Sequence, residues 1–161
     1  MDHNGTLELS PQRSFGYRLW MLRHAWTRRV EAVLQPTGLT HMQFFMMRVV
    51  SVASDLGEAP SQARLAEALM VDRMTVSTVV RTLEAKGLIR REVHPQDPRA
   101  NLITLTPEGS ALDHEAAVLV SVEQERFFGR LGYERQAAFS AMLDDLLDHE
   151  GVRSPHAKEK A

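Results

Sequence analysis

The sequence predicts a mainly α-helical protein that contains one small β-hairpin. Apolar residues recur at intervals of three and four over most of the 161 residues, which is the period of amphipathic helices. Helix-capping residues stand where this pattern stops and restarts, so several separate helices are expected. Residues 88–105 differ: two β-like segments flank Pro95 and Pro98, and prolines fit a hairpin tip but not a central strand.

Two helices are predicted in the N-terminal third of the chain. Residues 10–11 (Ser-Pro) combine an N-cap with a first-turn proline, and apolar residues then recur at helical spacing over residues 15–33. Proline and glycine within residues 36–38 end this first helix. Residues 40–43 (THMQ) fit a capping box, so a second helix is expected over residues 44–53.

Two short helices and the hairpin follow. The helices are expected over residues 61–69 and 73–86, and Asp72 is a good N-cap for the second of them. The strands of the hairpin are expected over residues 88–93 and 101–105. Two short helices joined by a tight turn and followed by a hairpin form a winged helix-turn-helix.

Two further helices are predicted in the C-terminal part. Thr106 and Pro107 supply an N-cap and a first-turn proline for a long helix, and Gly132 separates it from a last helix over residues 134–150. These helices carry more apolar surface than one helical layer could hide, which indicates a dimer interface. The residues concerned are Leu112, Ala116, Leu119, Val122, Phe127, Leu131, Phe139, Leu143, Leu146 and Leu147.

The predicted organisation is one intertwined domain. Its parts are a flexible arm (1–10), dimerisation helices (11–53 and 107–150), a winged helix-turn-helix DNA-binding region (54–106) and a flexible tail (151–161). The composition, with 43% apolar residues, 25% charged residues and a formal charge of −2, is that of a globular protein. The absence of cysteine excludes disulfides, cysteine-ligated metal and thiol switches. The polar N-terminus lacks the features of a signal peptide, so a cytoplasmic location is expected.

Charge is distributed unevenly along the chain. Residues 61–106 carry seven Lys and Arg against five Asp and Glu, whereas residues 107–150 carry three Arg against ten acids. Only the middle of the chain is therefore suited to face a polyanion. Two solvated faces of different composition would give the same pattern, so charge alone does not decide between these interpretations.

The helix predicted over residues 73–86 has two distinct faces. At 100° per residue, one apolar stripe that must be buried is made of Val76, Val79, Val80 and Leu83. The opposite face carries short hydrogen-bonding side chains and arginine, which suit a helix lying in a DNA major groove. Ser and Thr also occur on plain exposed helices, so the following hairpin is needed for the interpretation. The predicted DNA-contacting residues of this helix are Arg73, Met74, Thr75, Ser77, Thr78 and Arg81.

Residues outside that helix complete the predicted interface. Arg99, at the hairpin tip, is expected to enter a minor groove, where the negative potential is strongest, with Asp97 holding its guanidinium in place. The alternative is an ordinary surface ion pair, worth about 0–1 kcal/mol. Ser61 and Gln62, at the start of the preceding short helix, are expected to contact a phosphate.

Several motifs run through the winged part of the chain and its flanks. They are residues 97–109 (DPRANLITLTPEG), 65–68 (LAEA), 75–77 (TVS), 83–89 (LEAKGLI) and 38–40 (GLT) with Gln43. Together they resemble the MarR family of bacterial transcription regulators, and the resemblance extends from about residue 15 to residue 149. It implies a homodimer that binds a pseudopalindromic operator in double-stranded DNA, most often as a repressor. Met70 departs from the family pattern, which often has glycine in the turn, and methionine at positive φ would be strained.

The resemblance also implies a small-molecule effector, often an aromatic carboxylate, and no cofactor. Tyr17, Trp20 and His24 recur at helical spacing beside the core stripe, and Phe44 and Arg48 lie on the second helix. Aromatic walls with a cation would suit an aromatic acid. Ordinary packing and surface charge are the alternative for each residue taken singly. Without cysteine, a ligand rather than thiol oxidation would have to act as the switch.

An enzyme and a protein-binding module are the other function classes considered. The sequence has no His pair at helical metal-ligand spacing, no glycine-rich phosphate loop and no nucleophile elbow, so no catalytic or metal site is predicted. A winged-helix module that binds protein remains the alternative. It would need a large apolar anchor, and the 73–86 helix offers only Met74. Phosphate-driven binding would be distinguished by its salt dependence.

Overall fold

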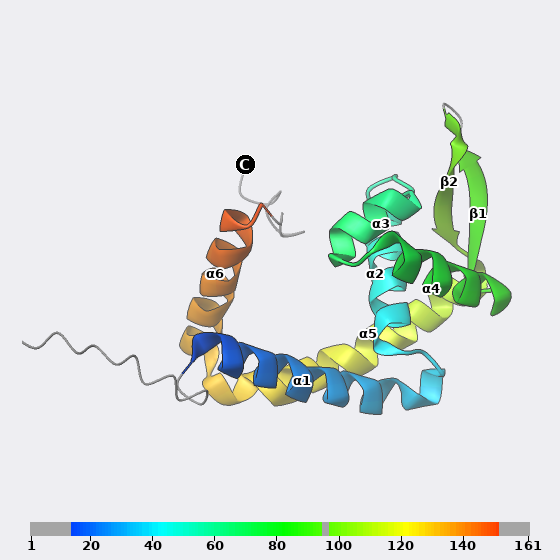
Figure 1. The fold of residues 1–161 in the computed structure, drawn as a ribbon. Helices are drawn as coiled ribbons and strands as arrows, with labels where there is room; N and C mark the ends of the chain where they lie inside the picture. The colour runs from blue at the N-terminus through cyan, green and yellow to red at the C-terminus, as the bar shows by residue number, and fades with distance from the viewer. Residues whose placement is uncertain (1–13, 95–96, 152–161) are drawn as a thin grey trace, which may run out of the picture.

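The computed structural model describes residues 14–94 and 97–151 and confirms a mainly helical fold with one hairpin (Figure 1). The elements are α1 (Phe15–Leu34), the 3₁₀ turn η2 (Gln35–Thr37), α2 (His41–Asp55), α3 (Gln62–Leu69), α4 (Arg73–Ala85), β1 (Ile89–His94), β2 (Asp97–Leu105), α5 (Pro107–Phe128), η3 (Gly129–Leu131) and α6 (Tyr133–His149).

The helix starts follow the capping residues. The Thr40 hydroxyl accepts from the Gln43 backbone N–H while the Gln43 side chain accepts from the Thr40 N–H, so the capping box is formed and α2 begins at His41. Asp72 caps α4 and Thr106 caps α5, also as predicted. The predicted cap residues Ser10 and Pro11 lie outside the described residues, but the predicted helix start was wrong. Helix α1 begins at Phe15, after Ser14, whose backbone is extended and whose side chain makes no capping hydrogen bond.

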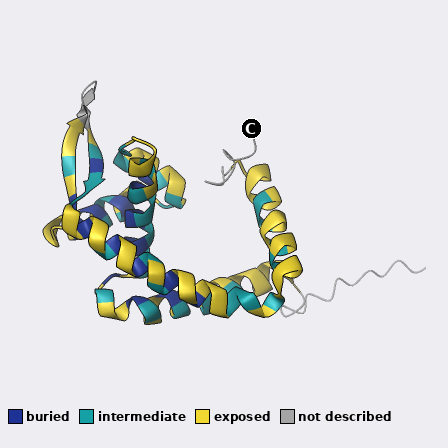
Figure 2. Ribbon diagram, turned by 180° about the vertical axis from the view of Figure 1, so that it is seen from behind, coloured by how far each residue is buried: buried dark blue, intermediate teal, exposed yellow. Residues whose placement is uncertain are grey.

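One apolar core joins the helix-turn-helix to the rest of the chain. Its largest fully buried side chains come from α1, α2, α3, α4 and β2, and Figure 2 shows buried residues gathered where these elements meet. The stripe predicted for α4 is part of it, with Val76, Val80 and Leu83 fully buried. Met46 and Met47 are core residues.

Helix α5 is the long support against which α1 and α2 pack. Its buried stripe contains two carboxylates, Asp113 and Glu123, alongside Ala116 and Val120. Asp113 pairs with Arg48 of α2, and Glu123 pairs with Arg29 of α1, each with a 2.5 Å N–O distance. Two ion pairs thus join α5 to the two N-terminal helices.

Helix α6 stands apart from the winged region. Figure 1 shows it rising at the far end of α1 and α5, opposite the hairpin, and none of its residues is buried. Large apolar side chains on the outer faces of α1, α5 and α6 are exposed in the single chain (Figure 2). They include Phe15, Leu19, Met21, Val118, Val122, Met142 and Leu146.

The C-terminal end of α4 is attached to α2 and α5 through short contacts. Lys86 Nζ donates to the Gly38 carbonyl oxygen at 2.8 Å and to Gln43 Oε1 at 3.2 Å. The Thr106 hydroxyl donates to the Gly87 carbonyl at 2.7 Å. Gly109 lies so close to the same turn that a Cβ added to it would be 1.9 Å from the Leu88 carbonyl oxygen. The orientation of α4 is therefore determined by α2 and α5.

Candidate nucleic-acid interface

Helix α4 begins at a well-formed cap. Asp72 Oδ1 accepts from the Thr75 backbone N–H at 2.8 Å, and the Thr75 hydroxyl donates to Oδ2 at 2.7 Å. The hydroxyl bond, followed by the backbone bonds, lowers the pKa of Asp72 below its ordinary value. The Asp72 carboxylate therefore stays ionised at neutral pH. Its negative charge interacts favourably with the positive N-terminal end of the helix dipole.

The outward face of α4 projects away from the core. Met74, Thr78 and Arg81 are exposed, and Thr75 and Ser77 are half-buried at the edge of that face. Arg73 is also exposed, at the first position of the helix. The structure thus places all six candidate residues of this helix on or beside one accessible surface.

The turn between α3 and α4 contains a methionine, Met70, with a positive φ angle. Met70 has φ 52° and ψ 41°, the left-handed conformation, and closes α3 as its C-cap. Its N–H donates to the Glu67 carbonyl at 3.2 Å, and the next N–H, that of Val71, donates to Ala66 at 3.1 Å. The turn therefore forms with methionine in place of glycine, and the Met70 side chain is directed into solvent.

The start of α3 lies next to the base of the hairpin. Ser61 caps α3 by accepting from the Arg64 N–H at 3.3 Å, and it forms an isolated β-bridge with Leu102 of β2. Gln62 follows in the first turn and is half-buried. The structure thus brings these two candidate residues to the side of the winged region that carries the hairpin.

The wing is a two-stranded antiparallel hairpin that projects beyond the helices (Figure 1). Its pairing runs from Ile89 opposite Leu105 to Val93 opposite Asn101, and an irregularity follows at Val93 and His94. Asp97 and Arg99 belong to the tip half of β2, but their side chains lie outside the described part of the structure. The Asp97–Arg99 pair therefore stays a prediction.

The charges around α4 favour the binding of a polyanion. Glu84 is the only acid within α4, and Arg91 of β1 pairs with it at 2.7 Å. Arg90 pairs with Glu92 at 2.8 Å on the same strand. With Glu84 neutralised, Arg73 and Arg81 are the uncompensated charges that α4 itself presents.

The candidate effector residues fall into two groups. Trp20 stacks on Tyr17 with ring centroids 6.0 Å apart and contacts His24 edge-on at 4.3 Å, and all three side chains lie on the exposed side of α1. Phe44 lies in the core, and Arg48 is engaged with Asp113. Within the single chain, no described ring contact or ion pair joins the two groups.

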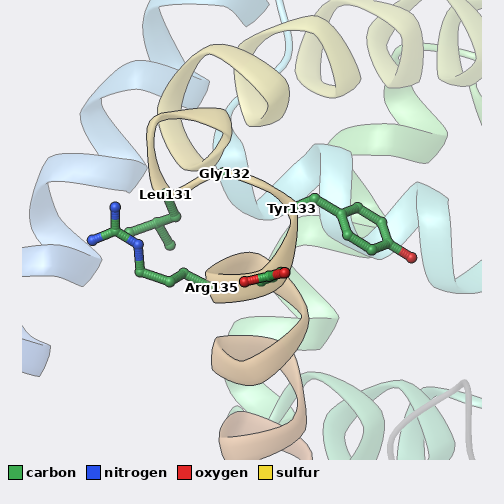
Figure 3. Close-up of a pocket in the computed structure, with 5 residues that line it drawn as sticks. Leu131, Gly132, Tyr133 and Arg135 are labelled. Atoms are coloured by element: carbon green, nitrogen blue, oxygen red, sulfur yellow. The ribbon is translucent and has the colours of Figure 1, made fainter.

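A small cavity lies at the corner between η3 and α6 (Figure 3). Its volume of about 310 Å³ is at the small end of the range for ligand sites, and it is open to solvent. Five consecutive residues line it, and Figure 3 shows Tyr133 and Arg135 pointing away from one another. None of the candidate effector residues contributes to it; the lining residues are Leu131, Gly132, Tyr133, Glu134 and Arg135.

The described residues contain neither a metal-binding cluster nor a membrane-spanning helix. Among them, no group of three or more His, Cys, Asp or Glu side chains is placed to hold a metal ion. None of the helices they form has the length and apolar character needed to cross a membrane.

Sequence reasoning missed the buried partners on α5. Asp113 and Glu123 fall in the register of Ala116 and Val120, at spacings of three and four, and so belong to the core-facing stripe. Acids at core positions of an amphipathic pattern could have indicated buried ion pairs. Their partners could not be named, because these lie on other helices.

Comparison with known proteins agrees with this architecture. Residues 39–100 match the family described as the MarR family. Over 140 residues the chain is 36% identical to the uncharacterized HTH-type transcriptional regulator YdcH of Bacillus subtilis (strain 168), covering 87% of this chain and 94% of that relative.

Solved structures show the same fold. The MepR–DNA complex of S. aureus aligns with a TM-score of 0.76 and 26% identity, over 84% of this chain and 98% of that one. CouR from Rhodococcus jostii RHA1 bound to p-coumaroyl-CoA aligns with a TM-score of 0.74 and 26% identity, over 86% and 93% of the two chains. CouR, a transcriptional repressor, has also been solved bound to a 23-mer DNA duplex. The chain therefore belongs to the MarR family and is a winged helix-turn-helix transcriptional regulator rather than an enzyme.

Proposed function

We propose that this protein is a dimeric, sequence-specific repressor that binds a pseudopalindromic operator in double-stranded DNA and is released by a small ligand. The observation that carries the DNA-binding part is the outward face of α4, where the only acid of the helix is neutralised by Arg91. The hairpin projects beside α4 (Figure 1), so one protomer would contact a major groove with α4 and the adjoining minor groove with the hairpin. The solved structures of MepR and CouR with DNA support the proposal that this chain binds DNA.

The dimer is supported by the apolar side chains that the single chain leaves exposed on α1, α5 and α6. So many exposed large apolar side chains on three helices indicate an interaction surface, and a two-fold axis through it would place two winged regions on one duplex. We assign residues 11–53 and 107–150 to dimerisation and residues 54–106 to DNA binding. Acting on DNA in a bacterial cell, the protein would work in the cytoplasm.

The direct test is fluorescence anisotropy with a duplex enriched from a random pool by the wild-type protein, titrated against a scrambled duplex. We expect tight, selective binding of one dimer per site. Affinity should fall on the order of 10³-fold or more between about 50 and 200 mM salt, because phosphate contacts release counterions. Equal binding of both duplexes, or binding without salt dependence, would favour a protein-interaction module instead.

The wing gives a second prediction. Arg99→Ala should weaken binding to the selected duplex by about 1–3 kcal/mol, because a guanidinium in a narrow minor groove is lost. Size-exclusion chromatography should show an unchanged dimer. Arg130→Ala removes an exposed guanidinium from η3, far from the hairpin, and serves as the matched control. Equal affinities of Arg99→Ala and wild type would remove the wing from the mechanism.

The effector part of the proposal rests on the aromatic row on α1 and on the ligand complex of CouR. Trp20→Ala and His24→Ala should change the release of DNA by ligand more than they change DNA affinity. Both residues belong to the N-terminal half of α1, and Figure 1 shows the N-terminal end of α1 away from α4. The anisotropy assay would be run with a panel of aromatic carboxylates and their coenzyme A thioesters. Normal release in both variants would exclude this row as the ligand site.

A further inference from the structure

From the outward face of α4 we infer that Met74 is a specificity-determining residue that reads the 5-methyl group of a thymine in the major groove. This inference rests on the proposed DNA-binding function and deepens it. Met74 is 81% exposed and stands in the first turn of α4, immediately after the Asp72 cap. Residues near the start of a recognition helix are the ones that reach base edges.

Two hydroxyl groups of α4 already donate within the helix and its cap. The Thr75 hydroxyl donates its proton to Asp72 Oδ2 at 2.7 Å, and the Thr82 hydroxyl donates to the Thr78 carbonyl at 3.0 Å. A hydroxyl has a single donor, so neither threonine can donate to a base without breaking an internal bond. What each still offers on its outer side is a methyl group and an acceptor oxygen.

The Arg81 side chain also makes a hydrogen bond to the backbone of its own helix. Arg81 Nε donates to the Ser77 carbonyl oxygen at 3.3 Å, which holds the start of its guanidinium along the helix surface. Arg81 stands seven residues beyond Met74, about two turns along the same face. The outer surface of the first turn of α4 therefore comes from the exposed Arg73, from Met74 and from Thr75, and Met74 is its apolar side chain.

Thymine is the base that such a surface recognises. Its C5 methyl is the only apolar group that any of the bases presents in the major groove, and apolar side chains contact it. A methionine side chain is flexible and polarizable, so it can follow the groove wall to reach this methyl group. Each half-site should therefore contain one thymine whose methyl group contributes to affinity through Met74.

The experiment replaces each thymine of the selected duplex by deoxyuridine, one position at a time, which deletes the methyl group and keeps base pairing. For wild type we expect one position per half-site at which affinity falls about fourfold, the factor expected for one buried methyl group. Met74→Ala should bind the unmodified duplex more weakly and lose its sensitivity to deoxyuridine at that position only. Met70→Ala, which truncates an exposed methionine outside the outward face of α4, is the matched control and should keep the wild-type pattern.

The outcomes separate this inference from the proposed function. If no duplex is enriched above the scrambled background, both the DNA-binding proposal and the role of Met74 are overturned. If a duplex is bound selectively but no thymine is sensitive, or if Met74→Ala keeps the wild-type sensitivity, the role of Met74 is overturned while DNA binding stands.

Discussion

Gly109→Ala is expected to lower the free energy of unfolding by about 3 kcal/mol, the upper end of the usual cost of overpacking. The added Cβ would stand 1.9 Å from the carbonyl oxygen of Leu88 and 2.8 Å from its carbonyl carbon. Both atoms are backbone, so no side chain can rotate away. The start of α5 would have to move from the α4–β1 turn, stretching the Thr106 hydroxyl bond to Gly87.

Urea denaturation followed by circular dichroism measures this loss. Gly129→Ala is the matched control, since its added Cβ would meet only the end of the Glu125 side chain, at 2.7 Å, and that chain can turn aside. Residue 129 also has φ −57°, which alanine adopts without strain. Equal stabilities for Gly109→Ala and Gly129→Ala would show that the close approach of α5 to Leu88 does not exist in solution.

Arg48→Met should cost about 3–5 kcal/mol of stability, because it leaves the carboxylate of Asp113 buried without its cation. The Asp113 side chain is only 2% exposed, and its Oδ1 makes no hydrogen bond within the described residues. The arginine is 33% exposed, so Asp113→Leu leaves a cation that can still reach water. The loss should therefore be larger when the arginine is removed than when the aspartate is removed.

Thermal and urea unfolding of both single variants and of the double variant Arg48→Met with Asp113→Leu tests this asymmetry. The double variant should recover most of the loss, since an apolar pair replaces the buried ion pair. Arg29→Met is the matched control: its partner Glu123 keeps a second cation, Arg126, at 3.9 Å, so the loss should be smaller. A larger loss for Arg29→Met would mean that Asp113 is better solvated than the fold indicates.

The contacts at the end of α4 suggest how the two parts of the regulator communicate. Lys86 connects this end of the helix to Gly38 and Gln43 at the start of α2, and Thr106 connects the following turn to α5. A change in the angle between α2 and α5 would therefore be transmitted to α4. A ligand that binds the dimerisation helices could release DNA in this way without touching α4.

Signals that are local in the chain were enough to predict most of the fold. The caps at Thr40, Asp72 and Thr106 act over three residues, and the buried stripe of α4 repeats every three or four. The two prolines at the tip indicated the hairpin. The resemblance of the hairpin sequence to the MarR family indicated a DNA-binding regulator. Two helix starts differed from the prediction. Helix α1 begins at Phe15 and not at Pro11, and the capping box begins α2 at His41, earlier than its apolar residues suggested.

The tertiary structure alone decided which polar groups meet. Arg48 looked from the sequence like a cation available to a ligand, but it pairs with Asp113, which is 65 residues away in the chain. Some local features were also not predicted. The hydroxyl bonds of Thr75 and Thr82 join residues three and four apart, and the left-handed conformation at Met70 was considered from the sequence only as a strained one. Caps and amphipathic stripes depend on neighbours within one helix, so the sequence by itself determined the elements and their faces. The partner of a buried charge depends on how distant helices cross, which is settled only when the whole core packs.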